Sequence, residues 1–412
     1  MKFSIFTPTN DTRYLIDLWQ SLKDQKGNFE WVLLLNGGAE LPFEFPKDSR
    51  IKVFTTTETR NIGKLKRRAC EMCSGDVLVE VDHDDLLSPE ALSSLEIAFQ
   101  DREIGFVYSD FVEFVDGTWE SSTYSSDWGW KTYETEVLGK NLTAIVSPGD
   151  HPRNISEIYF APNHVRAWRK EIYDKIGGHN ETLEAGDDHE LVCRTYLATQ
   201  FKRIPKCLYL YRRREEAKNS YLKKFDLIQI QSLANRDRYF QQLAERWANL
   251  HNLPMIDLGG GHGKPEGYKS VDLVNGDIKH DVRKGLPFKD STVGIIRAVD
   301  FLEHIQDKIK LINEIYRVLV PGGILLSITP STDGRGAFQD PTHASFYNEN
   351  SFFYYTNRMY NQYTPEAAVR FQAARLFTSF PTSEHKRLKV AYVFADLVSL
   401  KDGFRPMGLI EI

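Results

Sequence analysis

Short apolar runs alternate with amphipathic runs along the first half of the chain, and this alternation predicts strands separated by helices. The run at residues 77–81 has the apolar, β-branched character that is typical of a strand buried in an α/β sheet. In chain order, the predicted elements are strand 2–7, helix 14–23, strand 31–35, strand 51–55, helix 62–73 and strand 77–81. Strand and helix in repetition indicate a mostly parallel α/β sheet, with functional loops at the carboxyl ends of its strands.

A long helical pattern separates this region from a second set of alternating elements. Residues 221–250 contain neither glycine nor proline, and their apolar side chains recur at helical spacing. The second set comprises strand 254–258, strand 268–271, strand 293–298, helix 308–319 and strand 324–328. Because 412 residues exceed one ordinary core, we expect two α/β domains, residues 1–220 and 253–412, joined by a helical connector over residues 221–252.

Composition places the chain among globular proteins and limits its partners. Charged residues make up 26% and hydrophobic residues 41% of the sequence, which supplies enough apolar material for packed cores. A net charge of −5 argues against a general binder of nucleic acid or anionic membranes. Without a leader pattern near Met1 or a run of about 18 apolar residues, we expect a soluble, cytoplasmic protein with no transmembrane segment. The few, scattered cysteines fit a reducing compartment.

An acidic cluster follows the predicted strand at residues 77–81. Asp82, Asp84 and Asp85 stand at its carboxyl end, where open α/β sheets bind their ligands. Three carboxylates so close together repel one another, and a bound divalent cation that prefers oxygen ligands would relieve this repulsion. The alternative is a solvated acidic turn that caps the next helix, for which Ser88-Pro89 is a start signal.

Four short motifs accompany the acidic cluster: Thr7-Pro8-Thr9, Asn36-Gly37, Gly63-Lys64 and Gly75-Asp76. Over residues 1–220 the whole set resembles family 2 glycosyltransferases of the GT-A fold, a Rossmann-like fold that binds nucleotide-diphospho-sugars. The resemblance implies that Asp82 and Asp84 hold Mn²⁺ or Mg²⁺ against the diphosphate of a UDP-, GDP- or TDP-sugar. Asn36 stands where many members carry an aspartate, which leaves the nucleotide open. The donor-contacting residues implied by the resemblance are Thr7, Pro8, Thr9, Asn36, Lys64, Asp82, Arg212 and Ser220.

Basic side chains that could face the donor occur in two segments of this half. Lys64, Lys66, Arg67 and Arg68 could add positive charge near the donor, although a solvated helix face is the simpler interpretation. Arg212 and Ser220 belong to a segment that resembles the basic loop with which the family closes over the donor phosphates, a task suited to the paired donors of arginine.

Asp187 and Asp188 precede a predicted helix and resemble the acidic pair in which family 2 enzymes place their catalytic base. The resemblance assigns this role to Asp188, which would take the proton of the attacking sugar hydroxyl. Acids stabilised by a helix dipole give the same pattern, and one residue can serve both purposes. Residues 118–152 are irregular and rich in aromatic side chains, which predicts either an acceptor-side loop or a simply packed long loop.

A glycine-rich turn follows the predicted strand at residues 254–258. The motifs of this half are, in order, Asp257-Leu258-Gly259-Gly260-Gly261, Asp272, Asp281, Glu303-His304 and Pro321-Gly322-Gly323. This set resembles class I S-adenosylmethionine-dependent methyltransferases, which have a Rossmann-like fold, and its last two motifs favour methyl transfer over a nicotinamide enzyme. The resemblance implies S-adenosylmethionine as cofactor. It assigns Asp257, Gly259 and Gly261 to the methionine part, Asp272 to the ribose, Asp281 to the adenine and Glu303 to the same site.

His343 is the candidate catalytic residue of the second half. It could deprotonate an acceptor hydroxyl while Asp340 orients it, or it could be a structural histidine in a turn. Together the resemblances predict a bifunctional enzyme that performs metal-dependent, inverting sugar transfer to a glycan or other hydroxyl acceptor and O-methylates a sugar hydroxyl of the same glycan. The alternatives are methylation of a non-sugar substrate and a domain retained as a non-catalytic glycan- or nucleotide-binding module.

Overall fold

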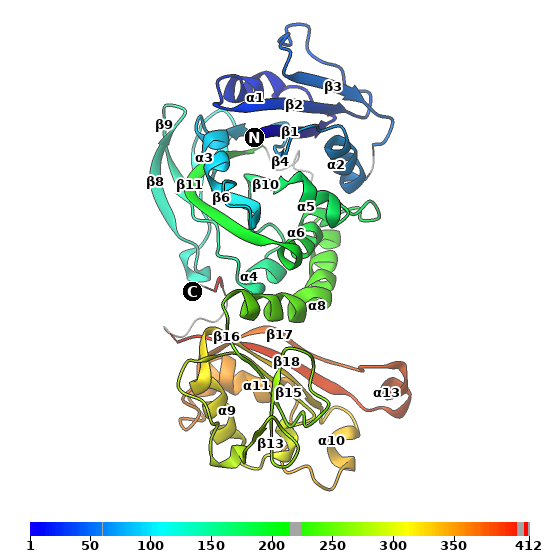
Figure 1. The fold of residues 1–412 in the computed structure, drawn as a ribbon, viewed down its shortest axis with the longest axis vertical. Helices are drawn as coiled ribbons and strands as arrows, with labels where there is room; N and C mark the ends of the chain where they lie inside the picture. Colours follow the sequence, from blue (N-terminus) through cyan, green and yellow to red (C-terminus); the bar gives the residue numbers. More distant parts are fainter. Residues whose placement is uncertain (60, 215–223, 402–407, 411–412) are drawn as a thin grey trace. The chain divides into compact units, whose positions relative to one another are not determined.

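The computed structural model describes residues 1–59, 61–214, 224–401 and 408–410. Its chain divides into two compact units, residues 1–240 and 241–412. The boundary falls within α8 (Phe225–Leu250), a single helix that occupies most of the segment expected to be helical (Figure 1). Within the described residues, no helix is long and apolar enough to cross a membrane.

The first unit is built on one large mixed sheet. Its strands are β1 (Lys2–Thr9), β2 (Asn28–Leu35), β3 (Ile51–Thr55), β4 (Val77–Glu80), β5 (Leu86–Leu87), β6 (Ile104–Val115), β7 (Ser121–Ser122), β8 (Thr132–Val137), β9 (Lys140–Ile145), β10 (Arg166–Arg169) and β11 (Gln200–Arg213). The order along the main path is β3-β2-β1-β4-β10-β6-β11-β5. The first four are mutually parallel as expected, but β10 runs antiparallel to both of its neighbours, so the sheet is mixed.

Helices flank this sheet and contribute apolar faces to its core. They are α1 (Leu15–Leu22), α2 (Ile62–Glu71), α3 (Ala91–Ala98), α4 (Pro152–Glu157), α5 (Lys170–Lys175), α6 (Asp187–Ala198) and the first part of α8. In α1 the buried side chains recur at helical spacing, and Trp19 stacks on Trp31 of β2 with 5.8 Å between the ring centroids.

The aromatic segment expected to be irregular contains a β-hairpin. β8 and β9 pair antiparallel across residues 132–145, and only Leu138 and Gly139 connect them. Both have positive φ angles, 52° and 70°, as a two-residue type I′ turn requires. Sequence reasoning missed this hairpin because β8 is largely exposed and the apolar alternation of both strands is weak.

The second unit is built on a seven-stranded sheet. Its strands are β12 (Met255–Leu258), β13 (Lys269–Asp272), β14 (Ile278–Lys279), β15 (Val293–Val299), β16 (Leu319–Pro330), β17 (Phe371–Ser379) and β18 (Tyr392–Ser399). The order is β14-β13-β12-β15-β16-β18-β17, and the first five strands are parallel. β18 runs antiparallel to β16 and to β17.

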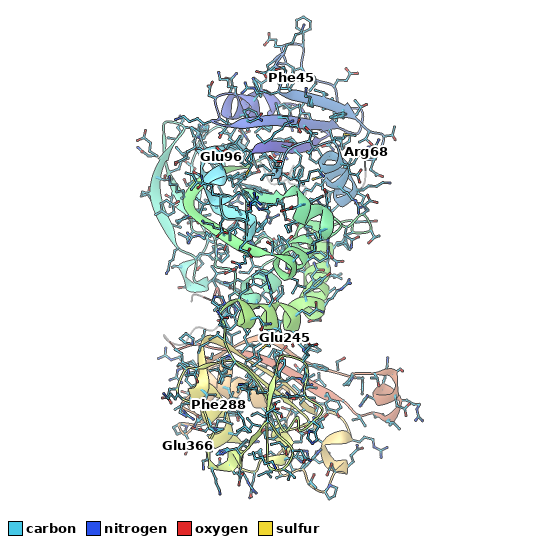
Figure 2. The ribbon with its side chains drawn as sticks, viewed as in Figure 1. Phe45, Arg68, Glu96, Glu245, Phe288 and Glu366 are labelled. Atoms are coloured by element: carbon cyan, nitrogen blue, oxygen red, sulfur yellow. The ribbon has the colours of Figure 1, made fainter. Side chains whose placement is uncertain are left out.

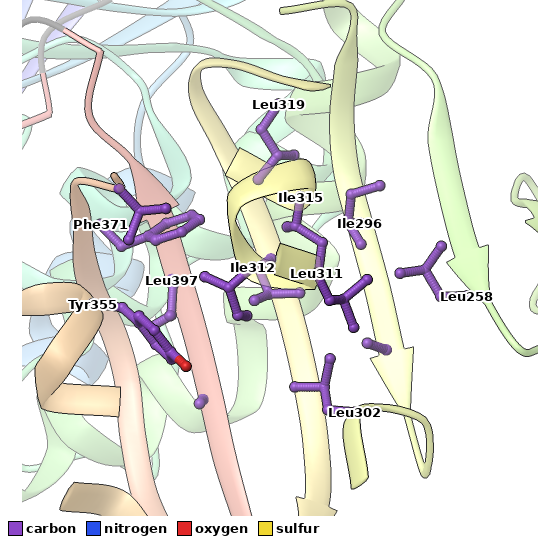
Figure 3. Packing of buried hydrophobic residues seen from close by; sticks show 14 of the residues in the cluster. Leu258, Ile296, Leu302, Leu311, Ile312, Ile315, Leu319, Tyr355, Phe371 and Leu397 are labelled. Atoms are coloured by element: carbon purple, nitrogen blue, oxygen red, sulfur yellow. The ribbon is translucent and has the colours of Figure 1, made fainter. Parts of the chain in front are cut away.

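The core of this unit lies between the sheet and its helices. The helices are α9 (Lys308–Val318), α10 (Gly336–Gln339), α11 (Glu349–Thr356), α12 (Arg358–Asn361) and α13 (Ser383–Leu388). Leu311, Ile312 and Ile315 of α9 pack with strand residues in one buried apolar cluster (Figure 3). Tyr355 of α11 joins the same cluster.

Candidate active sites

The first candidate site lies where the chain order of the strands changes direction. β1 pairs with β2 on one side and with β4 on the other, so the carboxyl ends of β1 and β4 meet at a topological switch point. Asp82, Asp84 and Asp85 follow β4 directly. The sheet topology therefore puts the acidic cluster where such folds bind ligands.

Asp85 ties this acidic turn to the end of β11. Its buried carboxylate accepts hydrogen bonds from the Tyr209 hydroxyl and the Arg212 backbone N–H, both at 2.7 Å. Burial, together with the negative charges of Asp84 and Asp82, raises the pKa of Asp85 well above its usual range. Hydrogen bonds to β11 thus occupy both oxygens of the Asp85 carboxylate.

Two arginines contact Asp84: Arg212, near the end of β11, and Arg214, which follows this strand. The Nε of Arg212 donates to the backbone carbonyl of Asp84 at 2.7 Å, and the Nε of Arg214 lies 2.9 Å from the Asp84 carboxylate. Burial and the neighbouring charge of Asp82 raise the pKa of Asp84 despite this guanidinium. Predicted Arg212 therefore lies beside predicted Asp84, whereas Ser220 lies outside the described residues.

The predicted base, Asp188, begins α6 beside Asp187. Arg166 binds the Asp188 carboxylate at 2.8 Å, and the Asp188 side chain remains 29% exposed. Although burial alone would raise the pKa of Asp188, the charges of Arg166 and Lys66 lower it. Asp187 is buried, one of its oxygens accepts no hydrogen bond, and burial raises its pKa. Of the pair, Asp188 is the ionised carboxylate that solvent can reach.

A buried charge cluster that the sequence did not reveal lies at the amino end of α6. Lys66 of α2 pairs with Glu80 of β4 at 2.5 Å, and both side chains are nearly inaccessible. Glu80 also lies 3.8 Å from Arg166, the guanidinium that binds Asp188. Assigning Lys66 to a solvated face was therefore wrong, whereas Arg68 of the same helix is exposed (Figure 2). The sequence signal for the burial of Lys66 was its helical spacing: it lies three residues after Gly63 and three before Ala69, and both of these residues are buried.

The remaining predicted donor residues lie near the ends of β1, β2 and α2. Thr7 is buried, donates to the Val81 carbonyl at 2.8 Å and accepts from the indole of Trp31 at 3.1 Å. Thr9 donates to the carbonyl of Asp11, and Asn36 is buried at the end of β2 next to Thr9. Pro8 lies between the two threonines in β1, and Lys64 is 49% exposed and paired with Glu58 at 3.1 Å.

The second candidate site lies at the switch point of the other sheet. β12 pairs with β13 on one side and β15 on the other, and the glycine-rich turn follows β12. Gly259 and Gly261 have φ angles of 74° and 50°, which glycine adopts without strain. A Cβ at Gly260 would lie 2.0 Å from the Asp257 carboxylate. This turn thus needs glycine at consecutive positions.

One of the two carboxylate oxygens of Asp257 has no hydrogen-bond partner among the described residues. Oδ1 accepts from Arg297 at 2.8 Å, whereas Oδ2 is buried and accepts no hydrogen bond. The glycine turn beside this oxygen has no side chains that would keep a ligand away from the backbone. A ligand with a hydrogen-bond donor, such as the amino group of S-adenosylmethionine, would supply the missing partner of Oδ2. Burial raises the pKa of Asp257, and the Arg297 charge opposes this.

The other predicted cofactor residues end neighbouring strands. Asp272 at the end of β13 accepts from the N–H groups of Val274 and Asn275, which lower its pKa. Asp281 follows β14 and pairs with exposed Arg283 at 2.8 Å. Glu303 follows β15, is buried and accepts from the Thr329 hydroxyl at 2.6 Å. All of them therefore lie along the carboxyl edge of the parallel strands.

His343 lines a small cavity with Glu303. The cavity measures about 240 Å³, and its lining also includes Asp300, His304 and Asp340. The Nε2 of His343 lies 4.0 Å from the Asp340 carboxylate, and its Nδ1 donates to the Ala337 carbonyl at 2.8 Å. The Asp340 carboxylate therefore lies near His343 without a hydrogen bond to it, and the ring is held by the Ala337 carbonyl.

Comparison with known proteins matches both units. The family model described as glycosyl transferase family 2 matches residues 4–155, and the model described as methyltransferase domain matches residues 238–327. A probable S-adenosylmethionine-dependent methyltransferase of Mycolicibacterium smegmatis is 34% identical over 71 residues, which is 16% of this chain and 28% of that protein. A chondroitin synthase of Escherichia coli is 22% identical over 232 residues, 54% of this chain and 30% of that protein.

Among solved structures, residues 1–349 of S. aureus TarS align at 17% identity and a TM-score of 0.42, covering 61% of this chain and 71% of that chain. The chain spans less than a third of the two sequence relatives described above. The two family models show that each unit, built on its α/β sheet, contains a transferase domain. The chain joins a glycosyl transferase domain of family 2, matched over residues 4–155, to a methyltransferase domain with a Rossmann-like parallel sheet, matched over residues 238–327.

Proposed function

We propose that the chain is a bifunctional enzyme with one activity in residues 1–220 and the other in residues 253–412. The first activity is metal-dependent, inverting transfer of a sugar from a UDP-, GDP- or TDP-sugar to a glycan hydroxyl. The second is S-adenosylmethionine-dependent methylation of a sugar hydroxyl in the same glycan. The observation that carries the proposal is the placement of acidic and glycine turns at the switch points of both sheets.

In the proposed sugar transfer, Asp82 and Asp84 hold Mn²⁺ or Mg²⁺, ions that prefer carboxylate oxygens. When bound, the ion neutralises the charge that develops on the leaving diphosphate. Arg212 and Arg214 border the same turn and would contribute further positive charge. Thr7, Pro8, Thr9, Asn36, Lys64 and Ser220 complete the proposed donor site.

Asp188 is the proposed base of this reaction. Its lowered pKa keeps it ionised at neutral pH, and Arg166 fixes its orientation while part of the side chain stays exposed. As the acceptor oxygen bonds to the anomeric carbon and the diphosphate departs, Asp188 takes the hydroxyl proton. The similarity to a protein named chondroitin synthase supports a glycan product.

In the proposed methyl transfer, the six predicted cofactor residues bind S-adenosylmethionine along the carboxyl edge of β12 to β15. The bound cofactor supplies an electrophilic methyl group. Because the His343 Nδ1–H donates to the Ala337 carbonyl, its Nε2 carries the lone pair and would accept the proton of the sugar hydroxyl. Positioning and exclusion of water supply the remaining catalysis.

The test is a product assay on the full chain with nucleotide-sugars, Mn²⁺ and methyl-labelled S-adenosylmethionine. We expect label in a glycan product only when a nucleotide-sugar and an acceptor glycan are both present. Label found only in protein, nucleic acid or a non-sugar small molecule would refute sugar methylation. Sugar transfer that persists unchanged in excess chelator would refute its dependence on metal.

A further inference from the structure

We propose that Glu303, His304 and His343 form a binding site for a divalent transition-metal ion in the methyltransferase domain. One ligand atom from each of the three residues lies within 4.8 Å of the others. Among the described residues, no second set of three or more histidine, cysteine, aspartate or glutamate side chains converges in this way. The site is separate from the acidic cluster after β4 and does not depend on it.

The hydrogen bonds of His343 leave its outer nitrogen free to bind a metal. The Nδ1 lies 2.8 Å from the Ala337 carbonyl, an acceptor, so Nδ1 carries the proton. The lone pair is then on Nε2. A backbone carbonyl behind the second ring nitrogen is the usual way in which proteins orient a metal-binding imidazole.

His304 is held in the same tautomer by Thr342. Its Nδ1 lies 3.3 Å from the Thr342 carbonyl and 3.1 Å from the Thr342 hydroxyl. The hydroxyl proton is committed to Asp340 at 2.7 Å, so both atoms that face Nδ1 are acceptors. His304 therefore also carries its proton on Nδ1 and its lone pair on Nε2. The two rings meet edge to face with centroids 5.1 Å apart.

Glu303 supplies the negative charge. Its side chain is 2% exposed, and one oxygen, Oε2, accepts from the Thr329 hydroxyl at 2.6 Å. The other oxygen, Oε1, is buried and accepts no hydrogen bond. A buried carboxylate oxygen without a partner is costly, and a cation at this position removes that cost.

The backbone fixes these side chains relative to one another. Glu303 and His304 belong to a short 3₁₀ turn, residues Leu302–His304, which begins three residues after the end of β15. The backbone carbonyl of Glu303 accepts from the N–H groups of Ala344 and Ser345, each at 2.8 Å. The segment that carries His343 is thereby bound to the residue that supplies the carboxylate. A site held in this way is organised before the ion arrives.

Two imidazoles and one carboxylate select ions of the Zn²⁺, Co²⁺ or Fe²⁺ type over Mg²⁺ or Ca²⁺. Three protein ligands leave coordination positions open, and the cavity of about 240 Å³ offers room for an oxygen ligand there. If methyl transfer proceeds as proposed above, that ligand is the acceptor hydroxyl, whose proton a metal makes easier to remove. This role rests on the proposed function, whereas ion binding does not. With the ion bound, His343 is a ligand in place of the proton acceptor assigned to it above, and the hydroxyl proton would pass to the Asp340 carboxylate, which lines the same cavity.

The test is titration of the metal-free full chain with Co²⁺, followed by visible absorption and by calorimetry with Zn²⁺. The titrations use Asp84→Asn as the parent, so that the first domain contributes little. We expect one tight site with the d–d absorption of Co²⁺ bound to nitrogen and oxygen. His304→Ala, His343→Ala and Glu303→Gln should each weaken binding at least about tenfold, whereas His251→Ala removes an exposed imidazole elsewhere and should change nothing.

S-adenosylhomocysteine binding to His304→Ala reports whether the second domain is folded, because this residue is not among the proposed cofactor contacts. Normal cofactor binding with lost Co²⁺ absorption confirms the site. Co²⁺ binding that none of the three substitutions weakens would overturn it, as would a parent that binds neither ion at micromolar concentrations. Metal binding together with a methyl-transfer rate that chelator leaves unchanged would retain the site and refute its role in the reaction.

Discussion

Replacing Lys66 by methionine should destabilise the first unit by leaving Glu80 without its nearest cation. Glu80 is 1% exposed and lies 2.5 Å from the Lys66 ammonium. Removing one partner of a buried ion pair costs about 3–5 kcal/mol. We expect about 3 kcal/mol, the lower end of this range, because Arg166 remains 3.8 Å from Glu80 and compensates part of its charge.

Urea unfolding followed by tryptophan fluorescence measures this loss, because all tryptophans except Trp247 lie in residues 1–240. Lys64→Met is the matched control: it removes a lysine from the same helix, but one that is 49% exposed. Its effect should stay below about 1 kcal/mol. Lys66→Met combined with Glu80→Gln should cost less than the sum of the two single changes. Equal effects of Lys66→Met and Lys64→Met would refute the reasoning.

Three further predictions concern acid stability and the two sites. Although burial alone would raise the pKa of Glu30, bonds from Lys2 and from two serines lower it to about 2. Ionised Glu30 therefore stabilises the fold by up to about 3 kcal/mol. This stabilisation is present above the pKa of Glu30 in the unfolded chain and is lost as the pH falls through about 2. A Glu30→Gln variant with the same acid unfolding profile as wild type would contradict this. Asp188→Asn should slow sugar transfer at least about a hundredfold while nucleotide affinity stays constant, and an unchanged rate would exclude Asp188 as the base. Gly260→Ala places a methyl group 2.0 Å from the Asp257 carboxylate and should weaken S-adenosylhomocysteine binding at least about tenfold. Gly263→Ala is the control, because a methyl group there makes only ordinary contacts and should leave binding unchanged. Equal affinities of the two variants would show that this turn is not part of the cofactor site.

Much of the fold could be predicted because its strands and helices are determined by local patterns of apolar and polar residues. The strand predicted at residues 51–55 is β3 to the residue, and the helix predicted at 308–319 is α9 within one residue. Asp82 and Asp257 could be placed at strand ends because a strand that leads into a turn is a local signal. The parallel part of each sheet then follows from the alternation of strands and helices, whereas the antiparallel strands β10, β17 and β18 do not.

What sequence reasoning missed depends on partners far away in the chain. Lys66 looks like other basic side chains of its helix, and only pairing with Glu80 explains its burial. Arg166 lies on antiparallel β10 and reaches Asp188, 22 residues later, through tertiary packing. The convergence of Glu303 and His304 with His343 likewise spans about forty residues, so no local pattern could reveal it.

The central claim, one ligand site in each unit, is tested most directly by calorimetry on wild type, Asp84→Asn and Asp257→Asn. Each protein is titrated with UDP, GDP or TDP, with and without Mn²⁺, and separately with S-adenosylhomocysteine. We predict that nucleotide binding requires Mn²⁺ and is lost only in Asp84→Asn, and that S-adenosylhomocysteine binding is lost only in Asp257→Asn. Binding of neither ligand to wild type, or loss of both ligands in one folded variant, would contradict the account.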